Sequence, residues 1–396
     1  MDQEKKKPVL LFTSREICYY SADFFMNQMA EAFETLGYPA RLCVLDLEKD
    51  VDAQLAPYVG NSYTAVLDIN SLLPRAVMDN GTPYLEQLDA PFYNYLVDHP
   101  FYHHPGLSVP LKNYHVLCLD ENHVAYAKKY YPHLESVSLL PLGATKALVP
   151  VPVERKKESV LFIGTYNCAA DVYREMEELP QGFKADDKAL IDIMLADPSI
   201  SQEEAFRSLL AGRGEELTDA EFAFRMNRMY HVDRYLRNYY REEAIHTLVR
   251  HHIPVTVLGN NWEQLKEQES RYFTIQPPVD FSMTFQKIAE YEVLLNVSPL
   301  FKAGVHDRVF AAMANQTVCL TDRNGYMERN FKDGGNISLF SLKHMEELPD
   351  MAEEFLSNPT RRQEVTAAAQ MEFDRKHSWL KRTEQFINLM EKEQNR

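Results

Sequence analysis

Three potential cations lie close together at residues 302–308 of the chain. Lys302, His306 and Arg308 follow a short apolar run at 293–297, whose composition is typical of a buried strand in a parallel sheet. From Asp307 onward the apolar residues recur at helical spacing, so a helix is expected to begin there. A loop and a helix start in this position can bind an anion such as a diphosphate through basic side chains and free N–H groups. The alternative is an ordinary crossover whose basic residues are solvated.

A second group of polar side chains follows another expected strand. The sequence DHPFYHH places one carboxylate and three imidazoles within residues 98–104. Asp98 or His99 could act as a general base, and His103 and His104 could contact substrate hydroxyl groups on the acceptor side. A metal site is not expected, because the group contains no cysteine and no regular ligand spacing. A histidine-rich surface loop is the alternative for His103 and His104.

The elements that must position these residues alternate between strand and helix. Such alternation predicts an α/β fold with doubly wound parallel sheets, which bind ligands at the carboxyl ends of the strands. Ser14 and Arg15 follow the first strand directly and are therefore expected at the same edge as residues 98–104. Strands are expected at 9–13, 41–47, 64–69, 92–97, 115–119 and 137–142, and then at 160–163, 255–258, 272–275, 293–297, 318–320 and 337–340.

The length of 396 residues exceeds what one hydrophobic core usually supports, so two domains are expected. Residues 141–154 contain three prolines without periodicity and are the best candidate for a linker. We expect an N-terminal Rossmann-like domain at 1–145, a C-terminal one at 156–375 with a helical insertion at about 168–250, and a C-terminal helix at 376–396 that packs back toward the N-terminal domain. The Tyr- and Arg-rich part of the insertion, 230–241, could contact a partner or simply pack on the sheet.

The composition argues against several classes of partner. A formal net charge of -16 disfavours nucleic acid and anionic membranes, since both require a basic surface. No apolar stretch is long enough for a signal peptide or a membrane span. The five cysteines (Cys18, Cys43, Cys118, Cys168 and Cys319) are scattered, which indicates reduced thiols in a cytoplasmic protein.

The strand-and-glycine segments of the second half resemble those of GT-B glycosyltransferases. They are LFIGTYN at 161–167, VTVLGNNW at 255–262, LLNVSP at 294–299, HDRVFAAMANQTVCLTD at 306–322 and NFKDGGNISLF at 330–340. Their order and spacing are similar to the CgeB-like branch of the group-1 glycosyltransferases, and the first half resembles the acceptor-side domain of such proteins at 98–100 and 139–144. The resemblance implies the GT-B fold, with two Rossmann-like parallel-sheet domains facing a cleft.

The resemblance also implies an activity. It is the metal-independent transfer of a sugar, of the hexosyltransferase type, from a nucleotide-diphosphate sugar to a protein or soluble glycan acceptor, without a cofactor. Arg308 matches the family arginine that neutralises the leaving diphosphate, and backbone would pass close to the donor at the family glycines. The donor-binding residues implied are Gly164, Thr165, Gly259, Asn260, Ser298, Lys302, His306, Asp307 and Arg308.

The sequence departs from the family at two positions. Many members carry a pair of glutamates around the helix that follows residue 306, and the second of them holds the ribose hydroxyls. The matching positions here are Ala303 and Ala311, so ribose recognition would come from elsewhere, such as His306 or Asp307. Two alternatives therefore stay open. One is a catalytically silent GT-B-like protein that binds a nucleotide sugar or a partner protein, and the other is a nucleotide-sugar epimerase.

Overall fold

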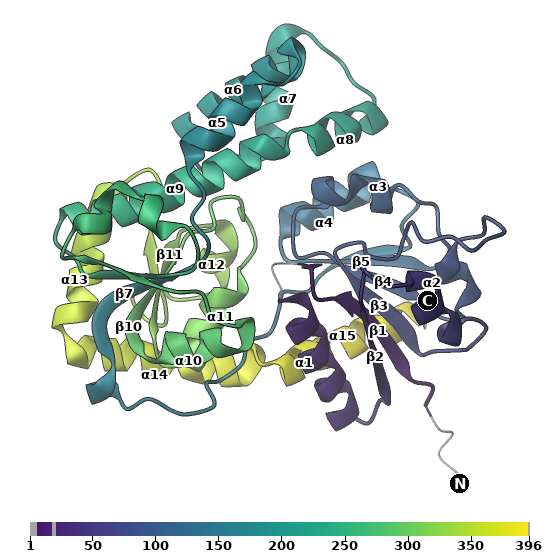
Figure 1. Ribbon diagram of the computed structural model, residues 1–396, viewed down its shortest axis with the longest axis horizontal. Helices are drawn as coiled ribbons and strands as arrows, with labels where there is room; N and C mark the ends of the chain where they lie inside the picture. Colours follow the sequence, from purple (N-terminus) through teal and green to yellow (C-terminus); the bar gives the residue numbers. More distant parts are fainter. Residues whose placement is uncertain (1–5, 18–20, 395–396) are drawn as a thin grey trace. The chain divides into compact units, whose positions relative to one another are not determined.

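The computed structural model describes residues 6–17 and 21–394, which form two compact units (Figure 1). The N-terminal unit runs to Gly143 and also takes in the chain from His377 onward, while Ala144–Lys376 forms the C-terminal unit. Cys18, expected to be a reduced thiol, lies outside the described residues, as do residues 1–5.

The N-terminal unit is built on a parallel sheet with the strand order β2-β1-β3-β4-β5-β6. Its strands are β1 (Val9–Ser14), β2 (Ala40–Leu45), β3 (Ala65–Ile69), β4 (Phe92–Tyr95), β5 (Tyr114–Cys118) and β6 (Ser136–Leu139). All residues of β1, β3, β4 and β5 are buried, as strands covered on both faces require. The six strands expected in this half are therefore confirmed. Strand β4 ends earlier than expected because the Val97 backbone N–H donates to Asn70 instead of continuing the sheet.

The helices of this unit are α1 (Ala22–Thr35), α2 (Val51–Leu55), α3 (His104–Leu107), α4 (Glu121–Tyr130) and α15 (Trp379–Gln394). Helices α1 and α15 pack together on one face of the sheet, and α4 packs over β5 and β6 on the other (Figure 1). Side chains at the end of α15 fix it to this sheet. The Tyr93 hydroxyl donates to Glu393 and the Tyr38 hydroxyl to Glu391, each at 2.7 Å. These bonds explain why the last helix of the chain belongs to the N-terminal unit.

The C-terminal unit contains a second parallel sheet, with the order β12-β11-β10-β7-β8-β9. Its strands are β7 (Lys157–Ile163), β8 (Val255–Leu258), β9 (Phe273–Gln276), β10 (Tyr291–Asn296), β11 (Val318–Asp322) and β12 (Ser338–Phe340). The outer helices are α10 (Thr284–Ala289), α11 (Asp307–Ala314), α12 (Gly325–Asn330), α13 (Leu348–Ser357) and α14 (Pro359–Lys376). All six expected strands are confirmed. Strands β8, β10, β11 and β12 are buried throughout, whereas the edge strand β9 exposes Thr274 and Ile275.

Five helices lie between β7 and β8. They are α5 (Ala169–Glu177), α6 (Gln181–Ala196), α7 (Gln202–Arg213), α8 (Asp219–Arg228) and α9 (Tyr230–Arg250). Helices α7 and α8 begin at capping boxes, Ser201 with Glu204 and Thr218 with Glu221. Helix α9 packs against β8 and α13, and it also carries α5 and α6 on its other side (Figure 1). Helix α9, the last helix of the insertion, thus packs both on the sheet and on the rest of the insertion.

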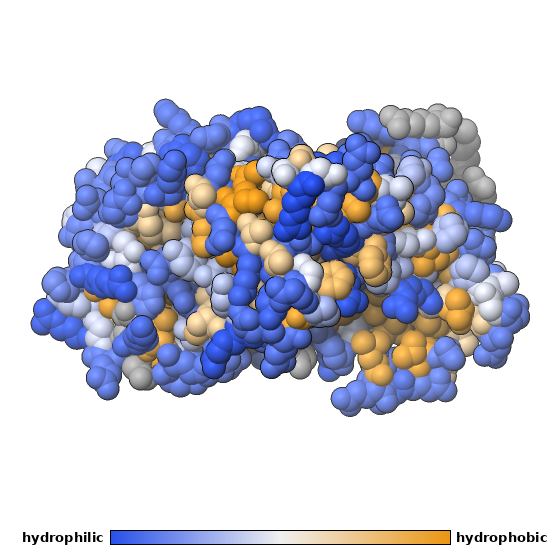
Figure 2. Space-filling view, turned by 90° about the horizontal axis from the view of Figure 1, so that it is seen from above, coloured by the Kyte–Doolittle hydropathy of each residue, from blue (hydrophilic) through white to orange (hydrophobic). Residues whose placement is uncertain are grey.

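The surface and the thiols agree with the composition. The face shown in Figure 2 is mainly hydrophilic, with smaller apolar areas among the hydrophilic side chains. Cys43, Cys118 and Cys319 are buried in strands and Cys168 is partly buried, and all four are free thiols. Within residues 6–17 and 21–394, no helix has both the length and the apolar character needed to cross a bilayer.

Candidate functional site

The strand order of the C-terminal sheet reverses between β7 and β10. Counted from β7, the order is 3-2-1-4-5-6, because β8 and β9 extend the sheet to one side and β10, β11 and β12 to the other. Ligands of open parallel sheets bind outside the carboxyl ends of the strands at such a reversal. The loops that follow β7, β8 and β10 at this edge bring together the donor-binding residues expected from the sequence: Gly164, Thr165, Gly259, Asn260, Ser298, Lys302, His306, Asp307 and Arg308.

Two glycines fit the loops after β7 and β8 together. A Cβ atom at position 259 would lie 2.1 Å from the carbonyl oxygen of Gly164, so no other residue fits there without a shift of backbone. The backbone N–H of Gly164 donates to Leu258 at 3.0 Å, and the indole N–H of Trp262 donates to the Gly164 carbonyl at 2.7 Å. Glycine at 259 is therefore required by the contact between the two loops themselves.

Arg308 lies in the first turn of α11 and approaches the same glycine loop. Its Nη2 atom is 3.9 Å from the position that a Cβ on Gly164 would take. Its Nη1 atom is buried and has no hydrogen-bond partner. Burial lowers the pKa of Arg308, while the neighbouring Asp307 carboxylate opposes that shift. A guanidinium buried without a full set of acceptors is costly, which is typical of a position built to receive an anion.

A second arginine, which the sequence analysis did not place in the site, comes from the insertion. Arg241 of α9 donates from Nε to the Val297 carbonyl at 3.5 Å, and its guanidinium carbon lies 5.9 Å from the centre of the Phe162 ring. Phe162 is the penultimate residue of β7, and Val297 directly follows β10. The pKa of Arg241 is well below its usual range, first because of burial and then because of Arg308.

His306 and Asp307 form a pair at the start of α11. His306 Nδ1 lies 2.6 Å from Oδ1 of Asp307 and 3.3 Å from the backbone nitrogen of Arg308. The shorter contact requires a proton on Nδ1, so the imidazole donates to the carboxylate. Burial raises the pKa of Asp307, but His306 and Arg308 outweigh that effect, and the pKa lies below its usual value. The pair therefore presents an ionised carboxylate beside Arg308.

The loop between β10 and α11 is held by hydrogen bonds of its own. The backbone N–H of Ser298 donates to Asp322 Oδ1 at 2.7 Å, and burial raises the pKa of Asp322 to about 6. The Lys302 ammonium donates to the carbonyls of Pro198 and Pro299, at 2.6 and 2.5 Å. Pro198 belongs to the insertion, between α6 and α7. Lys302 thus ties the loop to the insertion in this structure.

The positions of the two family glutamates are occupied by buried alanines. Ala303 is 8% exposed and Ala311 is 2% exposed. Ala311 lies within α11, and its carbonyl accepts from the side chain of Asn315 at 2.8 Å. Neither residue can bind a ribose hydroxyl through its side chain. The ionised carboxylate of Asp307 lies one turn of α11 before Ala311.

In the N-terminal unit, Asp98 follows β4 and Asn70 follows β3. The Asn70 side chain donates from Nδ2 to Asp98 Oδ2 at 2.8 Å and accepts from the Val97 backbone N–H at 2.9 Å. Asn70 has a positive φ of 52°, a conformation that asparagine tolerates better than most residues. One amide side chain therefore links two strand ends and orients the carboxylate of Asp98.

His99 is placed beside Asp98 but is committed to another bond. Its Nδ1 accepts from the Phe101 backbone N–H at 3.0 Å. A neutral imidazole has only one such acceptor nitrogen, so Nε2 carries the proton and can only donate. Burial holds the pKa of His99 well below 6.5, and His123 and His103 lower it further. This arrangement favours Asp98 over His99 as a proton acceptor.

The other acceptor-side residues are distributed around the same sheet edge. His103 Nε2 is buried without a partner, and burial lowers the pKa of this ring to about 4, against the opposing effect of Asp98. His104 Nδ1 contacts the Tyr131 hydroxyl at 3.0 Å. Ser14 is fully buried and donates to Glu16, whereas Arg15 is exposed. Across the described ranges 6–17 and 21–394, no three His, Cys, Asp or Glu residues are grouped as a metal site would need.

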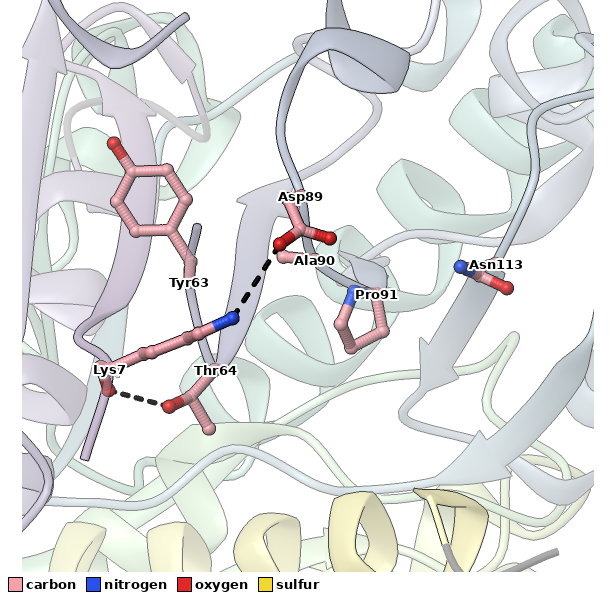
Figure 3. A pocket seen from close by; sticks show the side chains of 7 residues that line it. All are labelled: Lys7, Tyr63, Thr64, Asp89, Ala90, Pro91 and Asn113. Atoms are coloured by element: carbon pink, nitrogen blue, oxygen red, sulfur yellow. Dashed lines mark hydrogen bonds and ion pairs between the residues drawn. The ribbon is translucent and has the colours of Figure 1, made fainter. Parts of the chain in front are cut away.

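A shallow hollow of about 380 Å³ lies at the opposite edge of the N-terminal sheet. It is lined by Lys7, Tyr63, Thr64, Asp89, Ala90, Pro91 and Asn113, which precede the strands β1, β3, β4 and β5 (Figure 3). Lys7 reaches toward Asp89, with 3.5 Å between Nζ and Oδ2. Both side chains are more than half exposed, so this ion pair is solvated. The basic side chain that lines this hollow, Lys7, is exposed, unlike the partly buried Arg308 at the carboxyl ends of β7 and β10.

Comparison with known proteins identifies one matching family model. Residues 237–388 match the model described as Glycosyl transferase-like. The match begins in α9 and contains Arg241, Gly259 and Arg308. No curated protein sequence matches the chain significantly.

Solved structures share the fold of this chain at low sequence identity. Sucrose-phosphate synthase from Thermosynechococcus elongatus is 11% identical at a TM-score of 0.57, over 98% of this chain and 99% of that chain. T4 phage BGT in complex with its UDP-glucose substrate is 11% identical at a TM-score of 0.53, over 97% of this chain and 99% of that chain. These two likenesses confirm the expected α/β fold of the GT-B type, with two Rossmann-like domains. TarM is 11% identical at a TM-score of 0.47, over 82% of this chain, which spans about half of TarM (54%).

The contact between the two glycine loops predicts the effect of a small substitution. Gly259→Ala places a methyl group against the Gly164 carbonyl and should lower the free energy of unfolding by about 2 kcal/mol, as measured by urea denaturation. Gly182→Ala is the matched control, since a Cβ there meets nothing within 4 Å, and alanine is the better helix former in α6. Equal stability of the two variants would contradict the assigned contact.

Burial of His103 predicts a pH dependence of stability. Its folded-state pKa of about 4 lies below the ordinary value of 6.5, so the unfolded chain binds a proton below pH 6.5 that the folded chain does not yet bind. Stability should therefore fall as the pH falls from about 6.5 to about 4. His103→Asn should reduce this fall in denaturation experiments, whereas replacement of the exposed His133 by asparagine should leave it as in the wild type. An unchanged slope in His103→Asn would refute the interpretation.

Proposed function

We propose that this protein is a glycosyltransferase that moves a sugar from a nucleotide-diphosphate sugar to an acceptor. The observation that carries the proposal is the partly buried guanidinium of Arg308, whose Nη1 has no partner at the strand reversal of the C-terminal sheet. The match of residues 237–388 to a glycosyl transferase-like model supports it, since that segment contains Arg308. The similar structure of T4 phage BGT holds UDP-glucose, which makes a uridine nucleotide the first donor to test.

The chemistry follows from the charge that develops on the leaving group. The bond between the sugar C1 atom and the β-phosphate oxygen breaks, and the nucleoside diphosphate leaves with the electron pair. Arg308 and the positive end of the α11 helix dipole are in place to stabilise that negative charge before it develops. An acceptor hydroxyl attacks C1 and loses its proton. We assign Asp98 as the proton acceptor, because Asn70 orients its carboxylate while the acceptor nitrogen of His99 is already occupied.

Arginine side chains supply the positive charge that a divalent metal provides in other transferases. We therefore propose that donor binding needs neither a metal ion nor a cofactor, so a chelator such as EDTA should not weaken it. We also propose that the donor carries a hexosyl group, that the protein belongs to the CgeB-like branch of the group-1 glycosyltransferases, and that it is cytoplasmic. Among acceptors, a protein or a soluble glycan suits the acidic chain better than a nucleic acid, because the net charge is -16.

A second candidate function has one specific observation in its favour. Ala303 and Ala311 stand where related proteins carry carboxylates, so the chain could bind a nucleotide sugar without transferring the sugar. Release of free UDP distinguishes the two functions. The transferase releases UDP when UDP-glucose and an acceptor are both present, whereas the silent binding protein retains the intact donor.

Binding of UDP and UDP-glucose should depend on Arg308. In Arg308→Gln, which keeps polar atoms but removes the charge, UDP should bind at least tenfold more weakly in calorimetric titration, because a charge-assisted bond to phosphate is lost. Arg323→Gln is the control, since Arg323 is 42% exposed and pairs with Glu328 and Asp333. UDP affinity should be unchanged in this control.

Two results would contradict the donor site. One is a wild-type protein that no uridine, adenosine, guanosine or cytidine diphosphate stabilises in a thermal-shift screen. The other is UDP binding that is equally tight in wild type and Arg308→Gln, which would place the nucleotide away from α11.

A further inference from the structure

The helical insertion supplies a side chain to the edge where the donor is proposed to bind. Arg241 of α9 is bonded to the β10 loop through its Nε and the Val297 carbonyl at 3.5 Å. Its guanidinium lies over Phe162, whose ring is 3.4 Å from the Cβ position of Gly164. Arg308 approaches the same position from α11, at 3.9 Å. The two arginines therefore both approach the end of β7, Arg241 from α9 and Arg308 from α11.

The charges around this point are incompletely balanced. Arg237, one turn before Arg241, is paired with Asp233 at 2.5 Å. The carboxylate of Asp307 is bonded to His306, and that of Asp322 accepts from a backbone N–H. In the described part of the chain, no ion pair joins Arg241 or Arg308 to a carboxylate. Two cations that repel each other in a partly buried position gain most from an anion shared between them.

We propose that Arg241 is the second phosphate-binding residue of the site, so that a diphosphate is held between guanidinium groups from α11 and from the helical insertion. This inference rests on the proposed function and assigns a role to the insertion. A planar guanidinium can donate two parallel hydrogen bonds to phosphate oxygens, and a diphosphate offers oxygens on both phosphorus atoms. Each arginine can therefore bind one of the two phosphates, or both arginines can donate to oxygens of the same phosphate.

A diphosphate bound by Arg241 would add a link between the insertion and the sheet. Helix α9 packs against α5 and α6, and Lys302 bonds to the Pro198 carbonyl between α6 and α7. A diphosphate bonded to Arg241 would therefore connect the β10 loop to the insertion. We expect UDP to slow amide hydrogen exchange in α9 of the wild type and not in a variant without Arg241.

The test compares UDP and inorganic pyrophosphate binding to the wild type and to Arg241→Gln. Both ligands should bind at least tenfold more weakly to the variant, while uridine, which has no phosphate, should bind equally to both. The melting temperature of the free variant should be equal to or higher than that of the wild type, because a buried repulsion is removed. A purely structural role of Arg241 would lower it. Arg234→Gln is the control on the same helix, because Arg234 is 40% exposed and pairs with Glu175.

The outcomes separate this inference from the proposed function. Loss of UDP binding in Arg308→Gln together with unchanged binding in Arg241→Gln overturns the inference and leaves the donor site intact. Pyrophosphate binding that depends on Arg241, without binding of any nucleotide, supports the two-arginine site and contradicts the glycosyltransferase. A free Arg241→Gln protein with a lower melting temperature and unchanged UDP affinity shows that the residue only packs the helix, and that also overturns the inference.

Discussion

Two guanidinium groups share a partly buried position at the carboxyl ends of β7 and β10, and the surrounding structure has to hold them there. Burial and mutual repulsion lower the pKa of Arg241, and burial lowers that of Arg308. The opposing contributions are the carboxylate of Asp307 beside Arg308, the carboxylates of Asp233 and Asp322 near Arg241, and a carbonyl contact from Val297. A fold keeps such an arrangement when an anion completes it, because an anion supplies acceptors to donors such as Arg308 Nη1. The donor site and the role of the insertion both depend on this charge.

The loops at the carboxyl ends of the strands hold the two arginines in place against their mutual repulsion. Gly259 packs directly on the Gly164 carbonyl, and Trp262 donates to the same carbonyl, so the loops after β7 and β8 form one fitted unit. The loop after β10 is fixed by Asp322 through the Ser298 backbone N–H. Ionic groups placed on such loops cannot relax far from each other. Preorganisation of this kind is what makes fixed donors effective toward a leaving diphosphate.

Much of the fold could be predicted from the sequence because its strands are buried on both faces. Runs such as 293–295 are continuously apolar for that reason, and their alternation with helices predicted two parallel sheets. Arg308 could be placed in the site because it lies at the start of the helix that follows the β10 loop, which is a local pattern. Arg241 could not, since its proximity to Arg308 is set by the packing of α9 on the sheet. The spacing of Asp233, Arg237 and Arg241 along one helix face was the available signal.

The bonds made by His99 and Lys302 could not be predicted from the spacing of residues in the sequence. His99 was a candidate base from its position beside Asp98, yet its acceptor nitrogen is used by the Phe101 backbone N–H in a local turn. Lys302 was expected to bind the donor, and in the structure its ammonium is bonded to two carbonyls, one of them at Pro198 in the insertion. Both contacts depend on the three-dimensional conformation of the loops. The sequence therefore predicted the loops in which these two side chains lie, but not the atoms to which they bond.

The most direct test of the central claim is a crystal structure of the protein grown with UDP. Phosphate density is expected at the carboxyl ends of β7 and β10, with oxygens of the diphosphate within hydrogen-bond distance of both Arg308 and Arg241. UDP bound elsewhere on the chain, or a diphosphate at this edge that neither arginine contacts, would contradict the claim.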